Sequence, residues 1–167
     1  MKKISQLKIR RAEMSDIRPF YELFKHCLKT QFPHYSSKTI NAYLKKYFTR
    51  ENIAFDLRRK IVDLLLAFVG EEVAGYILTN PPYGGVVYIS WFSVKDSFQG
   101  HGIGSALLKE YEKIAKKRKI HKIHLWTDER NVKFYKKKKW ILVGHVPDNY
   151  FGSEDYLFYK TIQKSNY

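Results

Sequence analysis

The stretch from residue 86 to residue 118 constrains the fold more than any other part of the chain. It begins with nine mostly apolar, β-branched or aromatic residues, Val86–Val94, which predict a buried strand. A glycine cluster at residues 99–104 follows, and from Ile103 onward apolar residues recur at spacings of three and four, as on one face of a helix. This order exposes backbone N–H groups at the positive end of a helix dipole. It predicts a phosphate-bearing ligand on residues 100–105.

Two common phosphate-binding loops match this segment poorly. A Walker A loop needs Lys-Ser or Lys-Thr after its last glycine, and the dinucleotide fingerprint needs a third glycine where Ser105 stands. Gln99-x-x-Gly102-x-Gly104 instead resembles the Q/R-x-x-G-x-G/A signature of the GNAT superfamily of acyl-CoA-dependent N-acetyltransferases. In that family the amides of this loop hold the pyrophosphate of coenzyme A. The resemblance implies cofactor contacts from Gln99, Gly100, His101, Gly102, Ile103, Gly104 and Ser105.

Composition places the chain among globular proteins. Its 167 residues suit a single domain spanning residues 1–167, and 44% hydrophobic and 16% aromatic content excludes a disordered chain. The one cysteine, Cys27, rules out an internal disulfide and a cysteine-rich zinc site, and we expect no metal. No apolar run approaches the roughly 20 residues that span a bilayer, and the first residues lack a secretory signal. We therefore expect a cytoplasmic protein without a membrane partner.

The charge balance is strongly basic. The chain has 31 basic and 16 acidic residues, a net charge of +15, and a pI near 9.8. Such a field attracts anions, including nucleic acid, ribosomes and polyphosphate cofactors. A lysine-rich solvated surface is the other interpretation, because the lysines are spread along the chain without a recognised nucleic-acid module.

Patterns along the rest of the chain predict a mixed α/β fold. Strands are predicted at residues 7–12, 64–69, 73–79, 122–127, 141–146 and 156–161, and helices at 17–28, 40–47, 49–59 and 130–137. Ser15 or Asp16, Ser36-Ser37 and Thr49 are candidate helix starts. The helices between residues 17 and 59 could cover an acceptor groove or simply pack. This order resembles the GNAT arrangement over the whole chain, which implies a central twisted, mostly antiparallel sheet with helices on both faces.

A second local match lies at residues 134–140, where the GNAT family has Tyr-x-x-x-Gly-Phe. It implies that Tyr135 donates a proton to the departing coenzyme A thiolate, and a phenol with a pKa near 10 is protonated at neutral pH. The chain departs from the family at Lys139, which replaces the glycine, and at Asp128, where an asparagine is frequent. Asn131 could orient the pantetheine arm or the tyrosine, and Asp128 could instead cap the helix.

The general base is missing from the places where relatives have one. Residues 88–94 contain no carboxylate, and position 123 is an isoleucine. Three ways to obtain a neutral amine remain. A chain of water molecules or an acid from elsewhere in the fold could take the proton, or the acceptor could be an amine that is already partly neutral. An α-amine with a pKa near 8 is more often neutral than a lysine with a pKa near 10.4, which slightly favours a weakly basic acceptor. Glu154 and Asp155 are candidate acceptor-binding residues, or else the solvated tip of a hairpin.

These features predict an N-acetyltransferase that uses acetyl-CoA as co-substrate. The thioester carbonyl is expected on strand amides near Phe92 and Val94, and the amine attacks directly in a ternary complex. Cys27 lies far along the chain, so no acyl-enzyme is expected. The acceptor is either a protein N-terminal α-amine or a small amine or polyamine, and a longer acyl donor stays open. The alternative is a basic nucleic-acid- or ribosome-associated module of the same fold without turnover. We expect a monomer or a homodimer.

Overall fold

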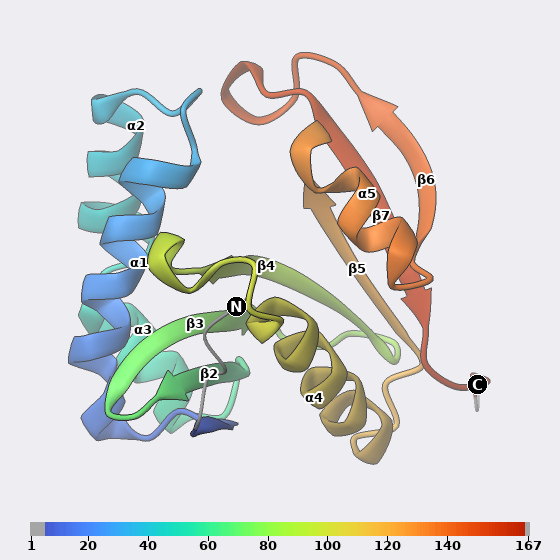
Figure 1. Cartoon of the computed structure of the whole chain (residues 1–167), viewed down its shortest axis with the longest axis horizontal. Helices are drawn as coiled ribbons and strands as arrows, with labels where there is room; N and C mark the ends of the chain where they lie inside the picture. Colours follow the sequence, from blue (N-terminus) through green and yellow to red (C-terminus); the bar gives the residue numbers. More distant parts are fainter. Residues whose placement is uncertain (1–5, 166–167) are drawn as a thin grey trace.

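The computed structural model describes residues 6–165. The strands in this range form one seven-stranded sheet (Figure 1). Its strands are β1 (Leu7–Arg11), β2 (Leu64–Val69), β3 (Glu72–Thr79), β4 (Val86–Val94), β5 (Lys122–Thr127), β6 (Ile141–Val146) and β7 (Asp155–Thr161). They lie in the order β1-β2-β3-β4-β5-β7-β6. All neighbours are antiparallel except β4 and β5, which are parallel. The predicted mostly antiparallel mixed sheet is confirmed.

Helices cover both faces of this sheet. They are α1 (Ile17–Gln31), α2 (Ser37–Ala42), α3 (Arg50–Arg58), α4 (Ile103–Lys117) and α5 (Glu129–Lys137), with a π-helical turn at Tyr43–Tyr47 directly after α2. Buried residues of α4 and α5 share one core with one sheet face, and those of α1, α2 and α3 share another with the opposite face. The side-chain alternation of β2 explains how one strand serves both cores. Leu65 and Ala67 pack on the α4 side, whereas Leu64 and Leu66 pack on the α1 side.

Most element boundaries agree with the sequence patterns. The ranges predicted for β2, β4, β5 and β6 match the observed bounds, while α1 continues past Leu28 to Gln31, whose side chain donates to the Val94 carbonyl oxygen at 2.9 Å. The side chains of Ser36 and Thr49 accept hydrogen bonds from Thr39 N and Asn52 N at 3.0 Å, so both act as N-caps. Asp16 does not cap α1 through its side chain.

The sheet opens between its two parallel strands. β4 and β5 pair only over Val86, Val87 and Tyr88 with residues 122–124. Beyond Tyr88, β4 continues with β3 as its partner, and β5 continues with β7. The two strands therefore diverge toward their carboxyl ends, as Figure 1 shows. This divergence creates the cleft described next.

Candidate functional site

A cleft of about 850 Å³ lies between the diverging strands β4 and β5. The second half of β4 forms one wall, and the end of β5 with the start of α5 forms the other. The glycine loop before α4 closes one end, and aromatic residues from positions 32–48 line the opposite end. This volume lies within the range of pockets that bind small molecules and cofactors.

The glycine loop needs its glycines for two different reasons. Gly100 and Gly102 have φ of +76° and +83°, in the left-handed region that glycine adopts without strain. A Cβ at either position would meet no heavy atom within 4 Å, so the space in front of the loop is open. At Gly104 a Cβ would lie 3.2 Å from the Phe92 ring, so this glycine allows α4 to approach β4 closely.

Gly102 is also the N-cap residue of α4, and no side chain caps this helix end. The first N–H groups of a helix have no partner within the helix, and the helix dipole adds positive potential there. The loop therefore presents backbone donors and open space to the cleft, which suits a phosphate group.

Gln99 and His101 contribute differently from the glycines. The Gln99 amide donates to the Val94 carbonyl oxygen at 3.0 Å and to Asp96 Oδ1 at 3.2 Å. Gln99 therefore ties the loop to the end of β4. His101 Nδ1 lies 2.8 Å from the Gln99 carbonyl oxygen, and His101 does not line the cleft, whereas the other residues predicted for this loop do. The predicted contact between His101 and the cofactor stays a prediction, and the His101 side chain does not support it through the cleft lining.

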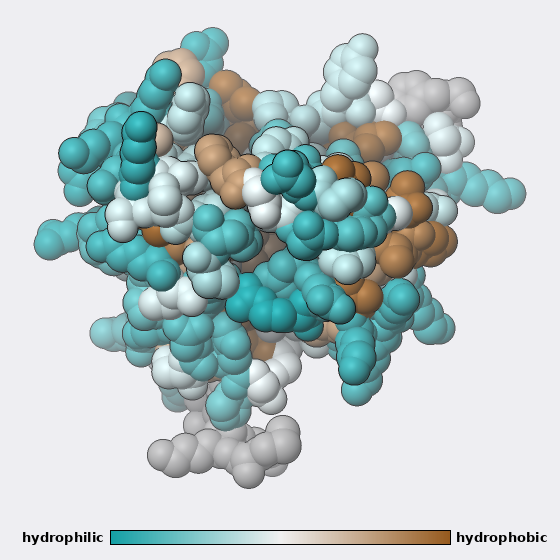
Figure 2. Space-filling view, turned by 90° about the horizontal axis from the view of Figure 1, so that it is seen from above, coloured by the Kyte–Doolittle hydropathy of each residue, from teal (hydrophilic) through white to brown (hydrophobic). Residues whose placement is uncertain are grey.

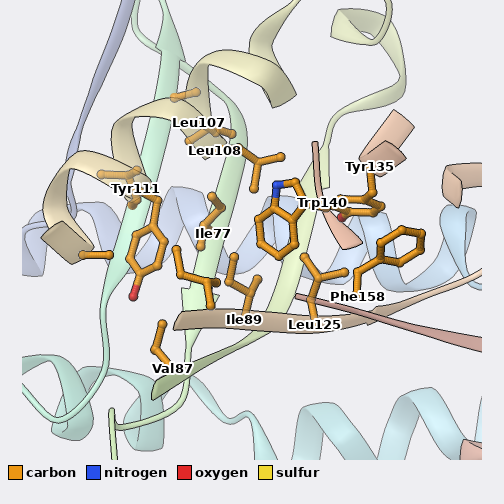
Figure 3. Packing of buried hydrophobic residues seen from close by; sticks show 14 of the residues in the cluster. Ile77, Val87, Ile89, Leu107, Leu108, Tyr111, Leu125, Tyr135, Trp140 and Phe158 are labelled. Carbon is orange, nitrogen blue, oxygen red and sulfur yellow. The ribbon is translucent and has the colours of Figure 1, made fainter. Parts of the chain in front are cut away.

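Tyr135 projects from α5 into the cleft while its ring is buried, with 5% of the residue exposed. Its ring centroid lies 5.6 Å from that of Trp140 and 5.5 Å from that of Phe158 (Figure 3). Burial raises the pKa of Tyr135, the nearby charge of Asp128 raises it further, and the Thr127 hydroxyl opposes them in part. The phenol is therefore protonated at neutral pH and can act as a proton donor.

The start of α5 connects the two sides of the cleft. Asp128 stands at the N-cap position, but its carboxylate accepts hydrogen bonds from the Arg130 and Asn131 side chains rather than capping the backbone. Arg130 Nη2 also donates to the Gln31 carbonyl oxygen at the end of α1, at 2.9 Å. Arg130 was not singled out in the sequence, since nothing local relates it to residue 31.

The structure separates the two candidate acceptor-binding carboxylates. Asp155 lines the cleft, is 9% exposed, and accepts hydrogen bonds through Oδ2 from Ser153 Oγ at 2.8 Å and Asn149 Nδ2 at 3.0 Å. Glu154 is exposed outside the cleft and lies 2.6 Å from His145 Nε2. Successive residues of an extended segment point in opposite directions, so only one of the pair can face the cleft.

The sequence left open whether the helices between residues 17 and 59 cover an acceptor groove, and it did not identify the aromatic residues that line the cleft. These residues include Phe32, Tyr35, Tyr43, Phe48, Tyr88, Trp91 and Tyr150. Burial raises the pKa of Tyr35 and of Tyr88, so their hydroxyls are neutral. The only signal in the sequence is the 16% aromatic content, which does not say which rings meet.

Two kinds of feature are absent from residues 6–165. No group of three or more His, Cys, Asp or Glu side chains there is placed to hold a metal ion. None of the helices in that range combines the length and apolarity needed to cross a bilayer. Hydrophilic side chains cover most of the face in Figure 2, with apolar residues in separate patches.

Comparison with known proteins agrees with the architecture. The PaiA N-acetyltransferase of Thermoplasma acidophilum, solved with coenzyme A, is 22% identical with a TM-score of 0.77, over 94% of this chain and 99% of that one. A GNAT-family acetyltransferase of Streptococcus pneumoniae is 21% identical with a TM-score of 0.78, over 95% and 100%. The yncA protein of Salmonella typhimurium, solved with acetyl-CoA, is 17% identical with a TM-score of 0.75, over 98% of each chain. At these identities the similarity establishes the fold.

Family membership comes from the sequence itself. The model of the acetyltransferase (GNAT) family matches residues 17–139, which include the glycine loop and Tyr135. This match covers most of the chain. The protein belongs to the acetyltransferase (GNAT) family.

Proposed function

We propose that this protein transfers an acetyl group from acetyl-CoA to a primary amine by direct attack in a ternary complex. The observation that carries the proposal is a single cleft holding both an uncapped helix N-terminus in a glycine loop and a buried, protonated Tyr135. Two proteins of the same fold were solved with coenzyme A or acetyl-CoA. Location in the cytoplasm and a monomeric or homodimeric state stay predictions.

The cleft offers places for the parts of acetyl-CoA. The pyrophosphate fits the amides of residues 100–105, where positive φ at two glycines leaves the space open. The thioester carbonyl fits the end of β4 near Phe92 and Val94, because no strand among the described residues pairs with this part of β4 on its β5 side. Asn131 in the first turn of α5 also lines the cleft, which suits contact with the pantetheine arm.

The reaction requires one proton to be delivered to sulfur. The neutral amine nitrogen attacks the carbonyl carbon, the carbon–sulfur bond breaks, and Tyr135 gives its phenolic proton to the thiolate. The attacking nitrogen loses one proton to solvent and Tyr135 regains one from solvent, so the products are the amide and the free thiol. Cys27 takes no part, because it is buried outside the cleft and burial raises its thiol pKa to about 12.

The glycine loop provides the most direct test. Gly102→Glu places a carboxylate in the open space before the amides, so occlusion and charge repulsion should abolish acetyl-CoA binding measured by calorimetry. Gly70→Glu is the matched control, because Gly70 has φ of +61°, similar open space, and no place in the cleft. Both variants should lose similar stability, and only the first should lose binding.

Unchanged affinity in folded Gly102→Glu would remove this loop from the cofactor site. The alternative function, a basic nucleic-acid- or ribosome-binding module, draws its support from the net charge of +15. RNA binding that weakens with salt, without turnover of acetyl-CoA by any amine, would favour that alternative.

A further inference from the structure

We infer that the acceptor is a small primary monoamine with a flat apolar body, bound with its ammonium on Asp155 and its body among the aromatic rings of the cleft. The inference rests on the proposed function and names the class of acceptor. It draws on three features: the charges in the cleft, the aromatic rings that line the cleft with Asp155, and the ring contacts of Phe151 at the acceptor end, which is the part of the cleft that Asp155 lines.

The cleft has one carboxylate with an oxygen that can still bind an ammonium group. Three carboxylates line the cleft among the described residues, and two of them are already engaged. Asp96 accepts from the Gln31 and Gln99 side chains, and Asp128 from those of Arg130 and Asn131. Asp155 accepts two hydrogen bonds through Oδ2, and no described residue donates to its Oδ1. Oδ1 is thus available to a ligand cation.

Aromatic rings line the same cleft as this carboxylate. Burial raises the pKa of Tyr35 and of Tyr88, and the charge of Asp155 adds to both shifts, which places both phenols within its field. Tyr35 and Tyr43 stack at 5.6 Å between ring centroids, and Tyr43 meets Trp91 edge-on at 5.5 Å. Aromatic faces attract cations and bury flat apolar groups. This wall suits the apolar body of an amine better than a hydrated chain.

A bridge restricts access to the acceptor end. Phe151, in the loop between β6 and β7, meets Tyr35 edge-on at 5.5 Å and Tyr43 at 5.6 Å. These contacts join that loop to the segment around α2, and Figure 1 shows the two converging. The N-terminus of a folded protein would have to displace this bridge, whereas a small amine would not.

A polyamine is disfavoured for an electrostatic reason. Its second and third ammonium groups would find Asp96 and Asp128 already engaged, and Glu154 outside the cleft beside His145. Lys137 and Lys138 also line the cleft, and the net charge of +15 opposes each added positive charge. A single ammonium paired with Asp155 avoids this cost, and it loses one proton to solvent before its neutral nitrogen attacks the thioester.

A panel of three acceptors tests the class. Phenethylamine, spermidine and a short peptide with a free N-terminus would each be assayed with acetyl-CoA by release of the coenzyme A thiol. We expect kcat/KM for phenethylamine to exceed that for each of the others by about tenfold or more. A preference for spermidine or the peptide would overturn the inference and leave the proposed function intact. No turnover with any amine would overturn both.

Paired variants test the role of Asp155. Asp155→Asn should raise KM for phenethylamine by about 30-fold and leave KM for acetyl-CoA unchanged, because it removes the charge that faces the ammonium. Glu154→Gln, one residue away and outside the cleft, is the matched control and should change neither constant. Equal effects of the two variants, or an effect of Asp155→Asn on acetyl-CoA alone, would contradict the assignment.

The bridge gives an independent variant in case Asp155→Asn does not fold. Phe151 is 56% exposed, so Phe151→Ala should keep the fold. It should reduce the ratio of kcat/KM for phenethylamine to kcat/KM for the peptide by about tenfold, since loss of the ring contacts with Tyr35 and Tyr43 opens the acceptor end. An unchanged preference would overturn the role given to the bridge, and with it the exclusion of peptides.

Discussion

Tyr135 is the residue on which the proposed chemistry depends most directly. Tyr135→Phe keeps the ring that packs on Trp140 and Phe158 but removes the proton donor. Turnover should fall by about 10²-fold or more, with little change in the affinity for acetyl-CoA, as measured by steady-state kinetics and calorimetry. Tyr111→Phe is the matched control, because this buried tyrosine of α4 points its hydroxyl at Asp63, outside the cleft.

The raised pKa of Tyr135 also determines how the wild-type rate should depend on pH. A phenol whose pKa is raised by burial stays protonated above the ordinary value, so kcat should not fall between pH 7 and about pH 10 through loss of this proton. A fall in the wild-type kcat near pH 8 that is absent in Tyr135→Phe would show that the pKa of Tyr135 is lowered and not raised, which would contradict this expectation. Full turnover of that variant at every pH would show that water protonates the thiolate.

At the scale of elements, three helices end in the same unusual way. Lys60, Lys119 and Lys139 follow α3, α4 and α5 with φ of +55°, +59° and +62°. In each case the next residue donates its N–H to a carbonyl five positions back, as Ile120 N does to Ala115 O at 3.0 Å. This is the Schellman geometry, which normally has glycine at the left-handed position.

These lysines predict a stabilising substitution. Lys119→Gly should raise the free energy of unfolding by about 0.5–1 kcal/mol, because the left-handed backbone costs a lysine more than glycine loses in chain entropy. Lys109→Gly, at an exposed position within α4, is the control and should lower stability by about 1 kcal/mol. Urea denaturation with an unchanged m-value measures both. A loss of stability in Lys119→Gly would mean that the lysine side chain makes contacts that offset its backbone strain.

At the scale of the whole molecule, one buried carboxylate connects distant parts of the chain. Asp63, just before β2, pairs with Arg11 at the end of β1 at 3.2 Å and with Arg118 after α4, and it accepts from the Tyr111 hydroxyl at 3.2 Å. Thr79 Oγ1 accepts from the Asp63 backbone N–H at 3.1 Å. These contacts hold α4 against the edge of the sheet.

Loss of this connection should lower stability without touching the cleft. Asp63→Ala should reduce the free energy of unfolding by about 2–3 kcal/mol, since it leaves the partly buried Arg118 guanidinium and the buried Tyr111 hydroxyl without their partner. Glu71→Ala, at the exposed hairpin turn between β2 and β3, should change it by less than about 0.5 kcal/mol. Denaturation monitored by circular dichroism compares the two. Equal stability would show that Arg11 and Arg118 are satisfied by solvent alone.

Much of the fold could be predicted from local patterns. The apolar runs of β2 and β4 and the stripe of α4 each depend on periodicity within a few residues, so their bounds were predicted closely. The helix ends at Lys119 and Lys139 were harder, because lysine gives no signal for a left-handed backbone. The turn at Lys139 is held in place by the next residue, Trp140, which is buried in the core.

The sequence by itself determined the order of elements, the glycine loop at a helix start, and the position of Tyr135, because each is encoded in contiguous residues. Only the tertiary structure decided that β4 and β5 separate after Tyr88, since strand pairing depends on residues more than 30 positions apart. That separation creates the cleft and places Asp155 inside it and Glu154 outside. It also brings Tyr35 together with Phe151, more than 100 residues later, through packing that no local pattern encodes.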